Sequence, residues 1–280
     1  MHNSLFHIYR NTPFGRETLL HSIYFSKQLQ LRLNIYIPRN SKFLMYFDPH
    51  TVQVDLDASY LKDPKTAQGH VEGILKEHGT QGRFFEPSEY TASSLPDIPA
   101  TYGFMTCPRV ISELSSSIRL GRIGSKVRSI LKHAAFPLLI PSQTFKPWTS
   151  LCVMFGGSIN GVKSLQLGLQ LAKRSGMPLD VFTQAEGGNA KKDYEHIIRS
   201  RSLEAEFTKQ VRSWYFQEGR DLSTNLFDVP HAALVIMGIY GHGLVKDVMF
   251  GNTTEAVQTT LPNSLLLVGP GFKYHPLYIS

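Results

Sequence analysis

The feature that most constrains the fold of this sequence is an internal repeat, in which the second half of the chain follows the pattern of the first. Gly15 lies 146 residues before Gly161, and the apolar segment 33–37 lies the same distance before segment 179–183. No gap is needed across this stretch. A fixed spacing of this length indicates two copies of one structural unit.

Further along the chain the spacing of the repeat becomes shorter. Segment 95–100 lies 131 residues before segment 226–231, so the first copy contains extra residues, mainly before its second helix. At 280 residues the chain is long enough for two domains that each bury a core. The repeat therefore predicts one domain over residues 1–145 and a second over residues 149–273.

Each copy alternates apolar strands with amphipathic helices, which predicts a doubly wound parallel sheet, a Rossmann-like α/β fold. In the second copy, segment 151–155 is a short apolar strand, and residues 190 to about 211 are predicted as one charged amphipathic helix. Segment 232–237 is apolar at every position, as is typical of a strand buried on both faces. Because such sheets bind ligands at the carboxyl ends of their strands, the loops after Phe155 and Met237 are the expected binding loops.

The last strand of each copy, segments 138–140 and 265–268, would be a bare sheet edge if each domain stood alone. Bare edges invite pairing with another strand. We therefore expect the two copies to associate through these strands as an intramolecular pseudo-dimer.

The strongest candidate for ligand chemistry is the pattern Gly238-x2-Gly241-x9-Gly251. Glycines let a phosphate approach the backbone closely, and the helix expected after Gly251 offers unpaired N–H groups and a partial positive charge to an anion. The hydroxyls of Thr253 and Thr254 add hydrogen-bond donors.

The order of these elements resembles the universal stress protein family. The shared features are a small Gly-Ser loop after the first strand, an apolar strand that leads into the glycine pattern, and a turn with proline before the last apolar strand. The resemblance covers nearly the whole chain, and the length is similar to that of tandem members.

The resemblance implies an adenine nucleotide alpha hydrolase-like fold and a stress-response regulatory protein of the cytoplasm. Some members of this family bind ATP and others do not, so the implied ligand is ATP or another adenine nucleotide, bound in the second copy. The residues expected to hold it are Phe155, Gly156, Gly157, Met237, Gly238, Gly241, Gly251, Asn252, Thr253 and Thr254.

The second copy departs from the family pattern at two positions. Nucleotide-binding members usually end the first strand with an acidic residue, where this copy has Gly156 and the first copy has Arg10. The residue after the last glycine is usually Ser or Thr, and here it is Asn252, whose amide can still donate or accept a hydrogen bond.

The first copy departs further, because Cys107 and Val110 occupy the positions of Gly238 and Gly241. A β-carbon at both positions would block close approach of a phosphate to the backbone. We therefore expect the first copy to be a degenerate partner of the second.

Other classes of function receive little support from the sequence. Two cysteines cannot form a disulfide framework or a four-ligand zinc site, and no metal site is evident. No apolar run approaches the length of a membrane span, so no membrane partner is expected. Because no phosphate-binding Gly-Lys-Ser/Thr loop or catalytic triad is present, we expect ATP hydrolysis to be slow at most.

The net charge of +7 is concentrated in residues 1–147, where 17 basic residues face 11 acidic ones. Six of the basic residues lie between Arg109 and Lys132, and we interpret them as a solvated helix face, with RNA or DNA binding as a minor alternative. The main alternative to nucleotide binding is an interaction scaffold with two vestigial pockets and an unidentified protein partner. Further homodimerisation stays open.

Overall fold

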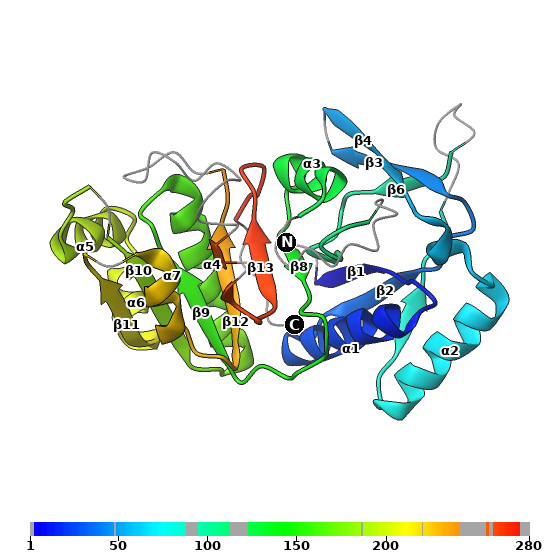
Figure 1. Ribbon diagram of the computed structural model, residues 1–280, viewed down its shortest axis with the longest axis horizontal. Helices are drawn as coiled ribbons and strands as arrows, with labels where there is room; N and C mark the ends of the chain where they lie inside the picture. Colours follow the sequence, from blue (N-terminus) through cyan, green and yellow to red (C-terminus); the bar gives the residue numbers. More distant parts are fainter. Residues whose placement is uncertain are drawn as a thin grey trace. The chain divides into compact units, whose positions relative to one another are not determined.

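The structure is a computed structural model, and its elements are labelled in Figure 1. It describes residues 3–47, 49–87, 95–111, 123–185, 187–219, 221–240, 256–257 and 260–274. The chain divides into two compact units, residues 1–118 with 123–146 and residues 119–122 with 147–280. Across the described ranges, every helix is too short or too polar to cross a bilayer.

The first unit is built on a parallel sheet with the strand order β8-β7-β1-β2-β5. One long helix connects β1 to β2, a second lies between β2 and β5, and a shorter helix precedes β8. The elements are β1 (Ser4–Ile8), α1 (Pro13–Gln28), β2 (Arg32–Tyr36), α2 (Pro64–Glu77), β5 (Gly82–Phe84), β7 (Phe104–Thr106), α3 (Ser125–His133) and β8 (Leu138–Ile140).

The extra residues predicted for the first copy form a small separate sheet. In it β3 (Lys42–Phe47) pairs antiparallel with β4 (His50–Asp55) and parallel with β6 (Asp97–Pro99). A short 3-10 helix, η1 (Ala58–Leu61), follows β4. Within the first unit, this insertion supplies the residues that cover the carboxyl end of β1.

The second unit has a parallel sheet with the strand order β11-β10-β9-β12-β13. The α/β fold with parallel sheets that the sequence predicts is thereby confirmed. The elements are β9 (Ser150–Met154), α4 (Ile159–Ser175), β10 (Leu179–Gln184), α5 (Lys191–Ser200), α6 (Glu204–Gln210), β11 (Val211–Gln217), α7 (Leu222–Asn225), η2 (Leu226–Asp228), β12 (Ala233–Gly238) and β13 (Leu265–Val268).

The first helix of each unit begins in the same way. Thr12 caps α1 by accepting a hydrogen bond from the Gly15 amide at 3.1 Å, and Ser158 caps α4 by accepting one from the Gly161 amide at 3.0 Å. Both caps lie 146 residues apart, at the spacing of the sequence repeat. A hydroxyl at this position satisfies one of the amides that the first turn of a helix leaves unpaired.

The prediction of one helix from 190 to about 211 is wrong. The structure has α5 and α6, separated at Ser202, whose φ of 56° lies in the left-handed region. A residue in that conformation cannot continue a right-handed helix. The buried side chain of Leu203 anchors the turn, so tertiary packing overrides the periodicity of the sequence here.

Gly168 sets how closely α4 packs on the second sheet. A β-carbon at this position would lie 2.3 Å from Cγ2 of Val153, a fully buried residue of β9. Protein interiors are packed too densely to absorb such a contact without a shift of the helix. The glycine is therefore required by the packing of helix on sheet.

We expect Gly168→Ala to lower the free energy of unfolding by about 1–3 kcal/mol, the usual cost of overpacking a core. Urea denaturation followed by circular dichroism measures the change. Gly73→Ala is the matched control, because Gly73 lies in α2 with nothing near its added β-carbon. That control should stabilise the first unit by up to about 1 kcal/mol. Equal effects of the two substitutions would contradict the packing argument.

Candidate functional site

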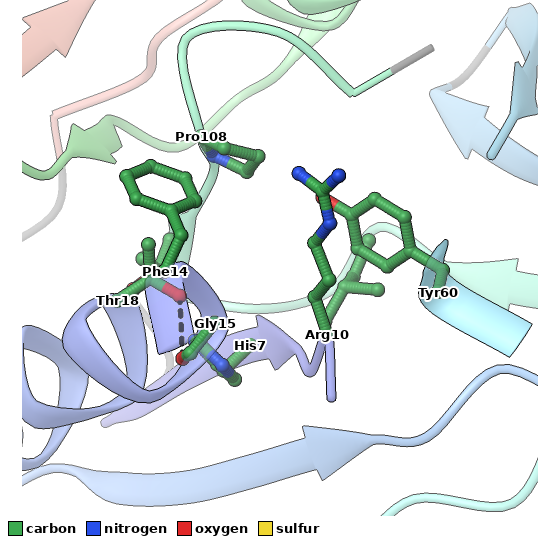
Figure 2. A pocket seen from close by; sticks show the side chains of 9 residues that line it. His7, Arg10, Phe14, Gly15, Thr18, Tyr60 and Pro108 are labelled. Carbon is green, nitrogen blue, oxygen red and sulfur yellow. Dashed lines mark hydrogen bonds between the residues drawn. The ribbon is translucent and has the colours of Figure 1, made fainter. Parts of the chain in front are cut away.

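A pocket lies at the carboxyl ends of β1 and β7 in the first unit, the sheet edge at which folds of this type bind ligands (Figure 2). Its volume is about 10 Å³, which is close to the space that one water molecule needs. The residues that line it are His7, Ile8, Arg10, Phe14, Gly15, Thr18, Tyr60, Thr106 and Pro108.

His7, in β1, is the most deeply buried polar group of this pocket. Its Nδ1 lies 2.8 Å from Oγ of Ser22, and that hydroxyl donates to Oγ1 of Thr106 at 2.7 Å. The same hydroxyl lies 3.2 Å from the carbonyl oxygen of Thr18, so Ser22 links the His7 ring to α1 and to β7. Burial lowers the pKa of His7 to about 3, so the ring is neutral at pH 7.

The second ring nitrogen of His7, Nε2, is buried, and among the described residues it has no hydrogen-bond partner. A buried polar atom without a partner costs free energy, and one water molecule in this pocket would recover it. The pocket is thus the size of a site for one water molecule and is too small for a nucleotide.

Arg10 lines the pocket just after the carboxyl end of β1. Its Nε donates to Oγ of Ser59 at 2.5 Å, and its guanidinium nitrogen lies 3.4 Å from the carboxylate of Asp57. Its Cζ lies 5.3 Å from the ring centroid of Tyr60, a cation–π contact, and Figure 2 shows the two side chains next to each other. Residues 57–60, here called the closing segment, thus hold Arg10 over the end of the strand.

Besides the carboxylate of Asp57, this region contains the phenol of Tyr60 and the thiol of Cys107, which ionise only at high pH. Burial raises the pKa of Tyr60, and burial likewise raises the pKa of the Cys107 thiol. Both are neutral at pH 7, and a thiol of raised pKa is a poor nucleophile. Cys107 is a packing residue of the core, which removes cysteine chemistry from this pocket.

Gly15 is required where α1 meets the end of β1. A β-carbon at this position would lie 1.6 Å from the carbonyl oxygen of Arg10. At its counterpart Gly161 the nearest atom, Oγ of Ser158, lies 3.2 Å away. The first unit therefore packs its helix more tightly against the strand end than the second unit does.

In the second unit, the loop after β9 contains three of the residues that are expected to hold the nucleotide, Phe155, Gly156 and Gly157. Phe155 is buried and packs edge-to-face on Tyr194, with ring centroids 6.2 Å apart. Its carbonyl accepts a hydrogen bond from Oγ1 of Thr183 at 2.9 Å. Gly156 and Gly157 are partly exposed, and Gly157 has a φ of 73°, which favours glycine. The two glycines are thus partly accessible to solvent, whereas Phe155 is not.

The loop after β12 begins at Gly238, which lies against the first turn of α4. A β-carbon on Gly238 would lie 2.3 Å from the carbonyl oxygen of Asn160, and Nδ2 of Asn160 donates to the carbonyl of Ile239 at 2.6 Å. The preceding residue, Met237, is buried in the strand. The two predicted binding loops of the second unit, after β9 and after β12, are thereby joined through Asn160.

Tyr240, which follows Ile239 in the loop after β12, has a φ of 57°. This conformation is uncommon for a residue with an aromatic side chain. Backbone strain of this kind is often found next to ligand sites. The remaining five predicted residues, Gly241, Gly251, Asn252, Thr253 and Thr254, lie outside the described residues.

Several residues that shape the carboxyl end of the first strand in each unit have no signal in the sequence. Asn160 lies at the repeat position of Phe14, so the spacing of 146 residues gave no signal for an amide there. Asp57, Ser59 and Tyr60 belong to the insertion, which has no counterpart in the second copy. Their contacts with Arg10 depend on the path of the chain after β4, and the spacing of apolar residues in the sequence does not predict that path.

The basic stretch from Arg109 to Lys132 is described in part. Lys126 lies 3.0 Å from the carboxylate of Asp55 and donates to the carbonyl of Gln53 at 3.2 Å. Arg119 and Arg122 lie outside the described residues.

In the part of the chain that the structure describes, no group of three His, Cys, Asp or Glu side chains could hold a metal ion.

The buried His7 makes stability depend on pH. Its pKa is 6.5 in an unfolded chain and about 3 in the folded one, so below pH 6.5 the unfolded chain takes up a proton that the folded chain does not. The free energy of unfolding should therefore fall by up to about 1.4 kcal/mol per pH unit through this window. His21, whose pKa burial lowers to about 4, adds to the slope.

We expect His7→Asn to reduce this slope between pH 6 and pH 4.5, measured by urea denaturation at each pH. His231→Asn, at an exposed position, serves as the control and should keep the slope of the unsubstituted protein. A slope that His7→Asn leaves unchanged would show that His7 is not buried as a neutral ring.

Comparisons with known proteins identify the fold. No family model and no curated protein matches the sequence. Among solved structures, a universal stress protein from Archaeoglobus fulgidus matches with a TM-score of 0.62 and 14% identity, over 95% of this chain and 98% of that one. A Pseudomonas aeruginosa protein assigned to the universal stress proteins matches with a TM-score of 0.56 and 16% identity, over 96% and 94%.

A third structure, the cytoplasmic domain of a prokaryotic cation chloride cotransporter, matches with a TM-score of 0.53 and 11% identity, over 98% of both chains. The chain therefore has the universal stress protein fold, as its sequence motifs predict. At identities this low, the likeness extends to the fold and not to a function.

Proposed function

We propose that this chain is a regulatory protein of the universal stress protein type, in which the second unit binds an adenine nucleotide and the first does not. The observation that carries the proposal is the difference between the two strand ends. In the first unit, Arg10 and the closing segment fill the end of β1. In the second unit, the corresponding loop presents the partly exposed backbone of Gly156 and Gly157.

The nucleotide would lie at the carboxyl ends of β9 and β12. Its phosphates would contact the backbone of Gly238, Gly241, Gly251 and Asn252, with the hydroxyls of Thr253 and Thr254 as further donors. Two features support this arrangement, the contact of Asn160 with Ile239 that joins the two loops, and the left-handed Tyr240 at the start of the glycine loop. Because the sequence has no Gly-Lys-Ser/Thr loop, the nucleotide would act as a regulatory ligand with slow hydrolysis at most.

Isothermal titration calorimetry with ATP tests this proposal. We expect one saturable site per chain, and we expect Gly241→Val to weaken binding at least about tenfold, because an isopropyl group would keep a phosphate away from the backbone. Gly73→Ala, in helix α2 of the first unit, is the control and should bind ATP as the unsubstituted protein does. No saturable binding at millimolar ATP, or equal affinity of Gly241→Val, would contradict the proposal.

The alternative is an interaction scaffold in which both pockets are vestigial. The small pocket of the first unit favours it for that half of the chain. The lack of an acidic residue at the end of the first strand, where the copies have Arg10 and Gly156, favours it for both halves. The related fold of a cotransporter's cytoplasmic domain is compatible with such a role. A partner that co-purifies with the chain, together with a failed ATP titration, would favour this alternative.

A further inference from the structure

We propose that the first unit binds a small phosphomonoester in a second pocket, at the amino ends of its strands. This pocket lies at the sheet edge opposite to the pocket of His7 and Arg10. Its volume is about 380 Å³, within the range of small-molecule sites of roughly 300–1,000 Å³. It is lined by Ser4, Arg32, Leu33, Asn34, Gln81, Gly82, Arg83, Thr101 and Tyr102.

The strand register gathers the polar residues of this pocket on one face of the sheet. Ser4 pairs with Arg32 across β1 and β2, and Asn34 pairs with Arg83 across β2 and β5. Because side chains alternate along a strand, Arg32 and Asn34 share a face, and their partners in register share it too. The two arginines are thus diagonal neighbours, two like charges with no acidic residue among those that line the pocket.

Three donor side chains of this pocket have no partner among the residues that the structure describes. Among the described residues, the side chains of Ser4, Arg32 and Arg83 make no hydrogen bond or ion pair. Ser4 is 6% exposed, so its hydroxyl has little access to bulk water. Glu86, two residues after β5, is 3.6 Å from Arg39 instead. Two unpaired guanidinium groups and a nearly buried hydroxyl leave a net charge that a dianion would balance.

The pocket is bounded by an aromatic surface as well as by charge. Tyr102 lines it and stacks on Phe6 with ring centroids 4.5 Å apart, and Phe6 lies on the same strand face as Ser4. Guanidinium groups bind phosphate oxygens in pairs of parallel hydrogen bonds, and an aromatic ring accommodates an apolar or planar substituent. These features together favour a phosphate ester over inorganic phosphate or an aliphatic dicarboxylate.

Calorimetric titration with phenyl phosphate tests the proposal, with inorganic phosphate and succinate as comparison ligands. We expect phenyl phosphate to saturate one site and to bind more tightly than the other two. Arg32→Gln and Arg83→Gln should each weaken its binding at least about tenfold, the effect of one charge-assisted contact. Higher salt should weaken binding as well, because both arginines are exposed.

Arg16→Gln is the control, since Arg16 is an exposed arginine of α1 that lies 3.4 Å from Glu77. It should leave the affinity for phenyl phosphate unchanged, and so should Gly241→Val, which separates this site from the proposed nucleotide site. The proposal is overturned if phenyl phosphate does not saturate, if inorganic phosphate or succinate binds as tightly, or if Arg16→Gln weakens binding as much as Arg32→Gln does.

Discussion

The approach of the first helix of each unit to the end of the first strand is the constraint on which the rest of the site depends. A hydroxyl cap and a glycine in the first turn let the helix begin directly after the strand, with Thr12 and Gly15 in one unit and Ser158 and Gly161 in the other. Any ligand at the carboxyl edge of such a sheet must share this space. We propose that the way in which each unit fills this space decides whether that unit can bind a ligand.

The two units fill that space differently. In the first, the carbonyl of Arg10 lies against Gly15, and the Arg10 side chain is held by the closing segment, so that the pocket left behind is the size of one water molecule. In the second, Asn160 takes the place of Phe14 and ties the start of the glycine loop to α4 through Ile239. The two copies of the same fold thus differ at this strand end. In the first unit an inserted segment makes the contacts, and in the second unit the amide of Asn160 makes them.

The periodicity of the sequence was sufficient to predict the α/β class, the parallel sheets and the equivalence of the first strand and helix in both halves. These features depend on local patterns, such as the continuously apolar strand that became β12. The break at Ser202 was missed because it depends on the packing of Leu203, which no window of sequence reports. The closing segment was missed for a similar reason, since its contacts with Arg10 span 47 and 49 residues of chain.

We propose that a nucleotide binds at the carboxyl edge of the second sheet and that the corresponding edge of the first is closed. Amide hydrogen exchange with and without saturating ATP tests this proposal most directly, because protection is assigned to segments. We expect slower exchange in residues 155–161 and 237–240, with residues 7–18 and 57–60 unchanged. Protection of residues 7–18, or no protection in either unit, would contradict it.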